Sequence, residues 1–294
     1  MSDKSALIKT AARRAGQFIT IAALIFLALA LYRQWGEVSA WQPTPLQIGL
    51  LVLLTLAYSA ALLLLAYNWV TIIGTLVEDP VPQARLLLSY TQTQIAKYVP
   101  GNVVHLVGRH LYLRDRGVAH RSLAMATLLE LVSLPVAAIV ALVLVVPVID
   151  IAYPTLPALW TFGWILPVAA AASVAAMTYF VQKRWRVPMI LVLIRGTGFM
   201  LSQGILFAII LAAVAGHFVM LAIPVAILAW LIGFLTPGAP GGLAVREAVL
   251  VSLLGYAGMN EGVLLAALLM RLVTTAGDFV LYLLPIGKKD SFDR

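Results

Sequence analysis

Residues 97–109 read KYVPGNVVHLVGR, and this stretch interrupts a long apolar segment with a helix break and two cations. Proline lacks a backbone donor and disfavours helical geometry in the residue before it, and the glycine that follows tolerates unusual dihedral angles. A helix is therefore expected to end near Val99 and a new one to begin after Gly101. Broken backbone at membrane depth persists only where it is buried in protein or lines a watery cavity, so the break predicts a site.

The composition indicates a polytopic helical membrane protein. Of the 294 residues, 62% are hydrophobic and 11% are charged, whereas about 25% charged residues is typical of soluble domains. The absence of cysteine excludes disulfides, thiolate metal sites and cysteine nucleophiles. A net charge of +8 would suggest a nucleic-acid partner for a soluble protein. In a membrane protein the cations instead report topology, and no nucleic-acid partner is expected.

Apolar runs and breaks predict an all-α integral membrane protein with about six transmembrane helices and two re-entrant helical hairpins. A span needs about 20 apolar residues. Residues 82–112 and 219–256 are each divided by a Pro-Gly break into halves too short to cross, so each is interpreted as a hairpin. The expected spans are residues 16–32, 46–77, 122–148, 162–181, 187–215 and 263–285. The first is interpreted as a retained span, because no small-residue cleavage site follows it.

The distribution of lysine and arginine favours this topology. A hairpin returns to the side it enters from, whereas each span changes sides. With a cytoplasmic N-terminus, fourteen cations fall in cytoplasmic segments and one, Arg33, falls outside. We therefore expect the chain in the cytoplasmic (inner) membrane of the cell envelope, with both termini cytoplasmic. The fourteen cations are Lys4, Lys9, Arg13, Arg14, Arg85, Arg114, Arg116, Arg121, Lys183, Arg184, Arg186, Lys288, Lys289 and Arg294.

The two breaks belong to an internal repeat. Gly117 lies 17 residues beyond Pro100, and Gly258 lies 18 residues beyond Pro240. In the spans that follow, Glu130 and Arg271 each lie 13 residues after the corresponding glycine. Three spans separate the hairpins, an odd number, so the two halves would be inverted in the membrane. Residues 1–155 and 156–294 are the expected inverted repeats, each with two spans, a hairpin and one span, which is typical of transporters with a midplane site.

Charged side chains inside the apolar segments predict what this site binds. A charge at a span centre costs roughly 2.5–3.5 kcal/mol on insertion scales, so each needs a partner or water. Five cations (Lys97, Arg109, Arg195, Arg246 and Arg271) outnumber three acids, leaving about two positive charges for an anion such as phosphate. The candidate substrate-binding residues are Lys97, Pro100, Gly101, Asn102, His105, Arg109, Glu130, Pro240, Gly241, Gly242, Arg246, Glu247, Arg271 and Asp278.

Structural interpretations of the same charges stay open. Arg271 and Asp278 are seven residues apart, on one helix face, and either could serve only in pairing between helices. Arg246 and Glu247 could form a self-contained pair that seats the second hairpin. Arg195 lies close enough to a cytoplasmic basic cluster to extend towards it.

Neither metal nor enzymatic chemistry is expected. His105 and His110 are five residues apart and do not share a helix face, which is unsuited to a metal pair. The chain contains no phosphate-cradling loop motif, no HExxH motif and no dinucleotide fingerprint. We expect no catalytic residue, no metal, no cofactor and no enzyme activity.

Two motifs resemble those of the lysylphosphatidylglycerol synthase transmembrane-region family. Residues 97–105, KYVPGNVVH, are similar to its K-Y-[LV]-P-G-x-[VI]-W-H motif, and residues 240–247, PGGLAVRE, to its P-G-G-[LI]-G-[VI]-R-E motif. Val104 stands where tryptophan is common, and Ala244 where glycine is common. The family includes the flippase part of multiple-peptide-resistance proteins and stand-alone members beside glycosyltransferases. The resemblance implies lipid translocation between leaflets, without the aminoacyl transfer of the family's soluble domain.

We therefore expect a flippase that moves an anionic, phosphate-bearing lipid, either a phospholipid or a polyprenyl-phosphate-linked sugar. The alternative is a non-transporting membrane scaffold for a glycosyltransferase or a lipid-modifying enzyme. A transporter of ions or small solutes is a third, weaker hypothesis. A transporter needs a polar cavity at the hairpins, whereas a scaffold can have them fully packed. Membrane lipids are the expected partners, and a homo-oligomer is left open.

Overall fold

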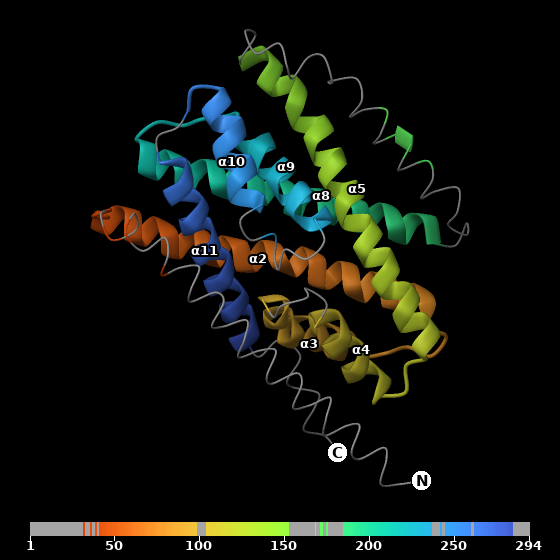
Figure 1. The fold of residues 1–294 in the computed structure, drawn as a ribbon. Helices are drawn as coiled ribbons and strands as arrows, with labels where there is room; N and C mark the ends of the chain where they lie inside the picture. The colour runs from red at the N-terminus through yellow and green to blue at the C-terminus, as the bar shows by residue number, and fades with distance from the viewer. Residues whose placement is uncertain are drawn as a thin grey trace.

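The computed structural model describes residues 41–98, 104–152, 185–236, 245–259 and 262–284, together with Tyr32, Gly36, Ser39, Val168, Ala171, Ala172, Ala175 and Gly242. This part of the chain is helical, with no strand in it, as the sequence predicted (Figure 1). Its elements are α2 (Pro45–Leu76), α3 (Gln83–Gln94), the 3₁₀ helix η1 (Ile95–Tyr98), α4 (Val104–Arg114), α5 (His120–Ala152), α8 (Arg186–Ala215), α9 (Ala222–Leu235), α10 (Val245–Tyr256) and α11 (Val263–Leu283).

Four of these helices, α2, α5, α8 and α11, are long and apolar enough to cross a membrane. Their most apolar windows have mean hydropathies of 1.8 to 2.7. They coincide within a few residues with four of the six expected spans, as expected of an integral membrane protein. The other two expected spans, residues 16–32 and 162–181, lie outside the described residues apart from isolated positions.

Large apolar side chains cover the outside of the long helices. Leu53 on α2 is 61% exposed, Leu128 on α5 is 56% exposed and Ile194 on α8 is 62% exposed. A protein folded in water rarely leaves a continuous apolar surface of this kind uncovered. Lipid chains are the environment that such side chains fit.

Local sequence explains where α2 begins. Thr44 caps the helix by accepting a hydrogen bond from the Gln47 amide at 3.3 Å, and the Gln47 side chain accepts from the Thr44 amide at 2.8 Å. Pro45 occupies the first turn, where its missing N–H is not needed. The Gln47 amide group also donates to the Ala213 carbonyl at 2.6 Å, which joins the start of α2 to the end of α8.

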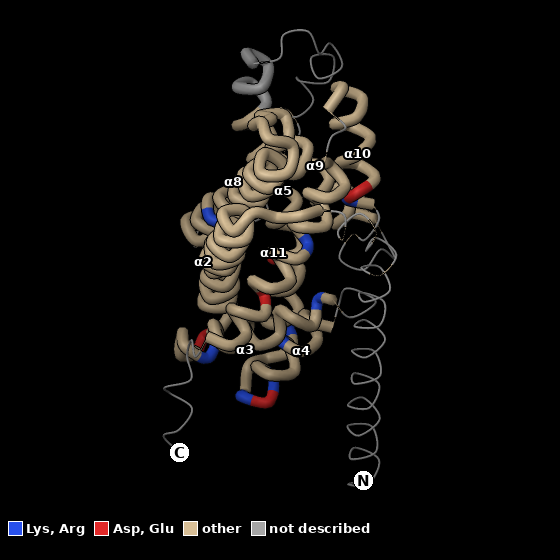
Figure 2. Tube along the Cα trace, turned by 90° about the vertical axis from the view of Figure 1, so that its left-hand side faces the viewer, with Lys and Arg blue, Asp and Glu red and all other residues tan. Residues whose placement is uncertain are grey.

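The helices occur twice in the order long, short, short, long: α2, α3, α4, α5 and then α8, α9, α10, α11. The long helices α2 and α8 pack together, α5 packs on α8 and α9, and α11 packs on α2 and α3. Figures 1 and 2 place α3 and α4 at the lower end of the molecule and α9 and α10 at the upper end. The last helix of each half, α5 or α11, therefore packs against helices of the other half.

The matched glycines end the two corresponding short helices in the same way. Gly117 has φ 89° and Gly258 has φ 77°, a left-handed conformation that favours glycine. After α4, the amide of Val118 donates to the Leu113 carbonyl at 3.2 Å; after α10, the amide of Met259 donates to the Leu254 carbonyl at 2.8 Å. Both turns are Schellman motifs, which satisfy the last helical carbonyls.

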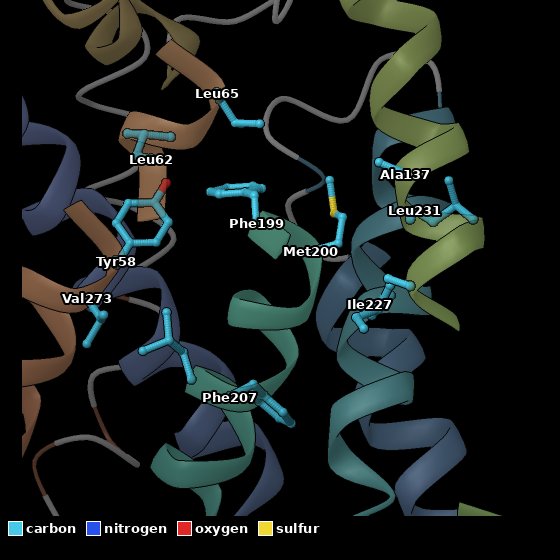
Figure 3. Close-up of a cluster of buried hydrophobic side chains, with 14 of the residues drawn as sticks. Tyr58, Leu62, Leu65, Ala137, Phe199, Met200, Phe207, Ile227, Leu231 and Val273 are labelled. Atoms are coloured by element: carbon cyan, nitrogen blue, oxygen red, sulfur yellow. The ribbon is translucent and has the colours of Figure 1, made fainter. Parts of the chain in front are cut away.

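The core lies where these helices meet. Figure 3 shows Tyr58, Leu62 and Leu65 facing Phe199, and Ala137, Ile227 and Leu231 gathered beside Met200. Two glycines allow the helices to approach closely. A Cβ on Gly277 of α11 would lie 2.5 Å from Tyr58 Cδ1, and one on Gly196 of α8 would lie 2.9 Å from the Ala137 Cβ.

Candidate functional site

A cavity of about 200 Å³ lies between the two pairs of short helices. All four long helices and all the short helices contribute to its wall, so it lies at the junction of the two halves. Much of the wall is aromatic or aliphatic. The polar and charged side chains that line it are Tyr58, Tyr90, Gln94, Lys97, Tyr98, His105, Glu130, Gln203, Arg246, Glu247, Arg271, Thr274 and Thr275.

The first ion pair joins η1 to α11. Lys97 Nζ lies 2.7 Å from Asp278 Oδ2 and donates to Asp278 Oδ1 at 2.9 Å and to the Tyr58 hydroxyl at 3.1 Å. The hydroxyls of Tyr58 and Tyr98 also donate to the Asp278 carboxylate. Asp278 is fully buried and does not line the cavity, whereas Lys97 does. The carboxylate is thus satisfied by three donors, two from η1 and one from α2.

The second ion pair joins α4 to α5 behind the cavity wall. Arg109 Nη1 lies 2.6 Å from Glu130 Oε2 and 2.8 Å from Glu130 Oε1. The guanidinium carbon lies 4.0 Å from the centre of the Tyr90 ring and 4.7 Å from that of Trp69. Arg109 is 1% exposed and does not line the cavity, whereas Glu130 does. Arg109 therefore serves to hold Glu130 and to tie the first short pair to α5.

The third ion pair joins α10 to α11. Arg271 Nε donates to Glu247 Oε1, and Arg271 Nη2 donates to the Gly242 carbonyl at 3.3 Å. Gly242 has φ 70°, and a Cβ there would lie 2.7 Å from Arg246 Nε. Both the backbone conformation and the space thus require glycine. The second and third pairs each link a short helix to the long helix after it, with the charges exchanged.

Arg246 is the cation of the cavity wall that forms no ion pair with any described residue. Its guanidinium carbon lies 5.6 Å from the centre of the Trp230 ring, and its buried Nε has no hydrogen-bond partner among the described residues. A Cβ on Gly233 would lie 2.7 Å from Arg246 Cγ, so the side chain occupies space that two glycines leave free. Arg246 is the clearest candidate for direct contact with an anion.

In the part of the chain that the structure describes, three other cavity-lining side chains carry a buried polar atom without a hydrogen-bond partner: Glu247 Oε2, Gln203 Nε2 and His105 Nδ1. His105 lies on α4, outside the four long helices. Burial, and next to it the charges of Arg109 and Lys97, lower the pKa of His105 to about 3. The imidazole is therefore neutral near pH 7.

The structure brings most of the predicted site residues together at this cavity. Lys97, His105, Glu130, Arg246, Glu247 and Arg271 line it, and Arg109, Gly242 and Asp278 contact residues that do. The predicted residues of the breaks themselves, Pro100, Gly101, Asn102, Pro240 and Gly241, lie outside the described residues.

Arg271 and Asp278 pair between helices, as one structural interpretation expected: Arg271 pairs with Glu247 on α10, and Asp278 pairs with Lys97 on η1. The interpretation of Arg246 and Glu247 as a self-contained pair is wrong, because Glu247 pairs with Arg271. Arg195 does not line the cavity and donates to Thr71 Oγ1 on α2 at 2.8 Å.

The sequence analysis missed several polar or aromatic residues of the site. Tyr58, Gln203 and Trp230 line the cavity from α2, α8 and α9, and Gln94 accepts a hydrogen bond from Arg109 at 3.4 Å. Gln203 had a usable signal, since a polar side chain inside an apolar helix such as α8 is expected to have a function, whereas Gln94 lies in a run of polar residues and had none. The aromatic residues had none, because tyrosine and tryptophan are also frequent at membrane interfaces.

Comparison of the chain with protein-family models, with curated proteins and with solved structures gave no match. The resemblance of the two Pro-Gly motifs to the lysylphosphatidylglycerol synthase transmembrane-region family therefore stays a hypothesis.

Proposed function

We propose that this protein moves an anionic, phosphate-bearing lipid between the leaflets of the membrane. The observation that carries the proposal is the cavity between the two pairs of short helices, with an unpaired Arg246 in its wall. A phosphate group accepts charge-assisted hydrogen bonds from a guanidinium, which makes it a suitable ligand for this side chain.

The charge balance around the cavity supports an anionic ligand. Three carboxylates neutralise three of the four nearby cations, and Arg246 is left over. The undescribed residues of the two breaks contain no charged side chain, so they do not change this balance. An uncompensated charge in a membrane interior is costly, and an anionic head group would remove that cost.

The proposal includes the topology expected from the sequence: six spans, two re-entrant hairpins and inverted halves. With 12 residues α3 is about 18 Å long, and η1 extends it to about 26 Å; α4, with 11 residues, is about 16 Å long, so each is shorter than a hydrocarbon core of about 30 Å. The same holds for α9 and α10, with 14 and 12 residues. The reciprocal packing of α5 and α11 supports the relation between the halves.

A transporter needs a polar cavity at the hairpins, whereas a non-transporting scaffold can have them fully packed, so the cavity favours transport over the scaffold. The buried polar atoms without a described hydrogen-bond partner also favour a ligand site, because a purely structural interior is expected to satisfy such atoms.

The proposal is tested with Arg246→Gln, and Arg195→Gln is the matched control. Both arginines lie in apolar segments, but Arg195 bonds to Thr71 away from the cavity. Loss of a charge-assisted hydrogen bond costs about 1.5–3 kcal/mol, so transport by Arg246→Gln should fall roughly ten- to a hundredfold. Lipid translocation in proteoliposomes is the measurement, with correct folding checked by thermal unfolding. Wild-type rates in folded Arg246→Gln protein would contradict the proposal, as would an equal loss in the control.

A further inference from the structure

The buried polar atoms of the cavity wall that have no hydrogen-bond partner among the described residues include both donors and acceptors. Arg246 Nε and Gln203 Nε2 are donors, and Glu247 Oε2, as part of an ionised carboxylate, is an acceptor. His105 Nδ1 can be either, depending on the tautomer. Gln203 is 6% exposed and Glu247 is 8% exposed, so bulk water does not satisfy these atoms. A ligand that fits the cavity must therefore supply acceptors and at least one donor.

The net charge restricts the ligand further. With His105 neutral, four cations and three carboxylates leave a single positive charge around the cavity. A head group with one negative charge neutralises it. A zwitterionic head group would leave the positive charge in place, and an ammonium would add to the cations Lys97, Arg246 and Arg271 in the wall.

We propose that the head group is a phosphodiester with one negative charge and uncharged hydroxyl groups, of the kind that a polyol or a sugar supplies. This inference rests on the proposed lipid transport and narrows its substrate. The phosphate accepts hydrogen bonds from Arg246 and Gln203, and a hydroxyl donates to Glu247 Oε2. The cavity, with a volume of about 200 Å³, has room for a small head group. Trp230 and Tyr98 provide aromatic surface for the carbon atoms of the polyol or sugar.

Three lipids with the same acyl chains test separately whether binding requires a negative charge and whether it requires a hydroxyl group. Phosphatidylglycerol is a monoanionic phosphodiester with two hydroxyls, phosphatidylmethanol has the same charge and no hydroxyl, and phosphatidylethanolamine carries an ammonium. Binding to the purified full chain is measured for each by thermal stabilisation and by native mass spectrometry. We expect phosphatidylglycerol to bind about tenfold more tightly than phosphatidylmethanol, the effect of one hydrogen bond to a charged acceptor, and more tightly than phosphatidylethanolamine.

Two variants assign the contacts. Glu247→Gln exchanges the free acceptor for an amide donor, so it should abolish the preference for phosphatidylglycerol over phosphatidylmethanol. Gln203→Leu removes a donor to the phosphate and should weaken the binding of phosphatidylglycerol and of phosphatidylmethanol by a similar factor. Ser202→Ala is the control, because Ser202 bonds to the Phe199 carbonyl and does not line the cavity. If Glu247→Gln does not fold, the comparison of the three lipids on the wild-type chain decides by itself.

The outcomes separate this inference from the proposed function. Equal binding of phosphatidylglycerol and phosphatidylmethanol, or tighter binding of phosphatidylethanolamine, would overturn the inference, and translocation of these lipids would still support transport. Selective binding without translocation would support the head-group assignment and contradict transport. Neither binding nor translocation of any of the three lipids would overturn both.

Discussion

At the scale of single residues, the described part of the interior is organised by three buried or partly buried ion pairs and by Arg246, which has no ion-pair partner there. Each pair also has neutral donors, acceptors or aromatic rings around it, as Asp278 has Tyr58 and Tyr98. Burying two charges costs several kcal/mol per ion, and attraction repays this only when the geometry is good and further hydrogen bonds are made. Such pairs contribute little net stability, but the loss of one partner is expensive. Their role here is to define which helices meet at the cavity.

A double-mutant cycle on Arg109 and Glu130 tests this role. Arg109→Met leaves the carboxylate buried and unpaired, and should lower the free energy of unfolding by about 3–5 kcal/mol. Glu130→Met should cost a similar amount. The double variant should be much closer to wild type, because no charge is left uncompensated. Denaturant unfolding in detergent measures all three proteins, and additive losses in the double variant would mean that the two residues are not coupled.

The histidine pair between α4 and α5 predicts a pH dependence of stability. His110 Nε2 lies 2.8 Å from His120 Nδ1, a hydrogen bond that requires one neutral ring. Partial burial, then the nearby His120 and Arg114, lower the pKa of His110. Because the unfolded chain then binds the proton more readily, stability is full above pH about 6.5 and falls as the pH drops below it.

Thermal unfolding between pH 5 and 8 measures this effect. His110→Gln should flatten the pH dependence below pH about 6.5. The control is His217→Gln, since His217 lies in an exposed turn and contacts only the Ala215 carbonyl. The same slope in wild type and in His110→Gln would show that His110 is not the titrating group.

At the scale of elements, α4 and α10 each end in a turn that sets the direction of the long helix after it. The Schellman turns at Gly117 and Gly258 release the chain from α4 and from α10 and lead it into α5 and α11. The long helix in each case carries one partner of the ion pair, Glu130 or Arg271. A turn in the wrong conformation would misplace that partner.

Substitution of either turn glycine by alanine should destabilise the protein by roughly 1–2 kcal/mol, the cost of a left-handed residue with a Cβ. Neither position has an atom within 4 Å of an added Cβ, so backbone strain alone is measured. Gly74→Ala in α2 is the matched control: its surroundings are equally open, and within a helix alanine should stabilise by about 0.5–1 kcal/mol. Denaturant unfolding is the measurement. A gain of stability in Gly117→Ala would contradict the assigned turn.

At the scale of the whole molecule, the two short-helix pairs lie at opposite ends, and α5 and α11 run in opposite directions between them (Figures 1 and 2). Two halves related by an axis in the membrane plane would have this arrangement. The cavity then lies at the junction of the halves, where small relative movements could change the side to which it opens.

Labelling of single cysteines tests the orientation, and the natural chain, with no cysteine, needs no background substitution. Asp115→Cys lies in the turn after α4 and Tyr256→Cys at the end of α10, and both positions are exposed. A membrane-impermeant thiol reagent should reach Asp115→Cys from the cytoplasmic side and Tyr256→Cys from the opposite side. Reaction of both from the same side would exclude inverted halves.

The amino-acid sequence by itself determined the helical class, the bounds of the four described spans and the positions near which the short helices end. These features follow from apolar run length, proline and glycine, which act locally. The sequence also determined how many charged side chains inside apolar segments need partners. Tertiary structure decided which partners they find. Arg271 and Asp278 share a helix, and the sequence did not identify their partners on other helices. In the structure α11 lies between two sets of short helices and presents Arg271 to α10 and Asp278 to η1. Lys97 and Asp278 are 181 residues apart in the chain, and the packing of α11 on α2 and α3 brings them together. The unpaired state of Arg246 follows from the same packing, since its neighbour Glu247 is already bound to Arg271.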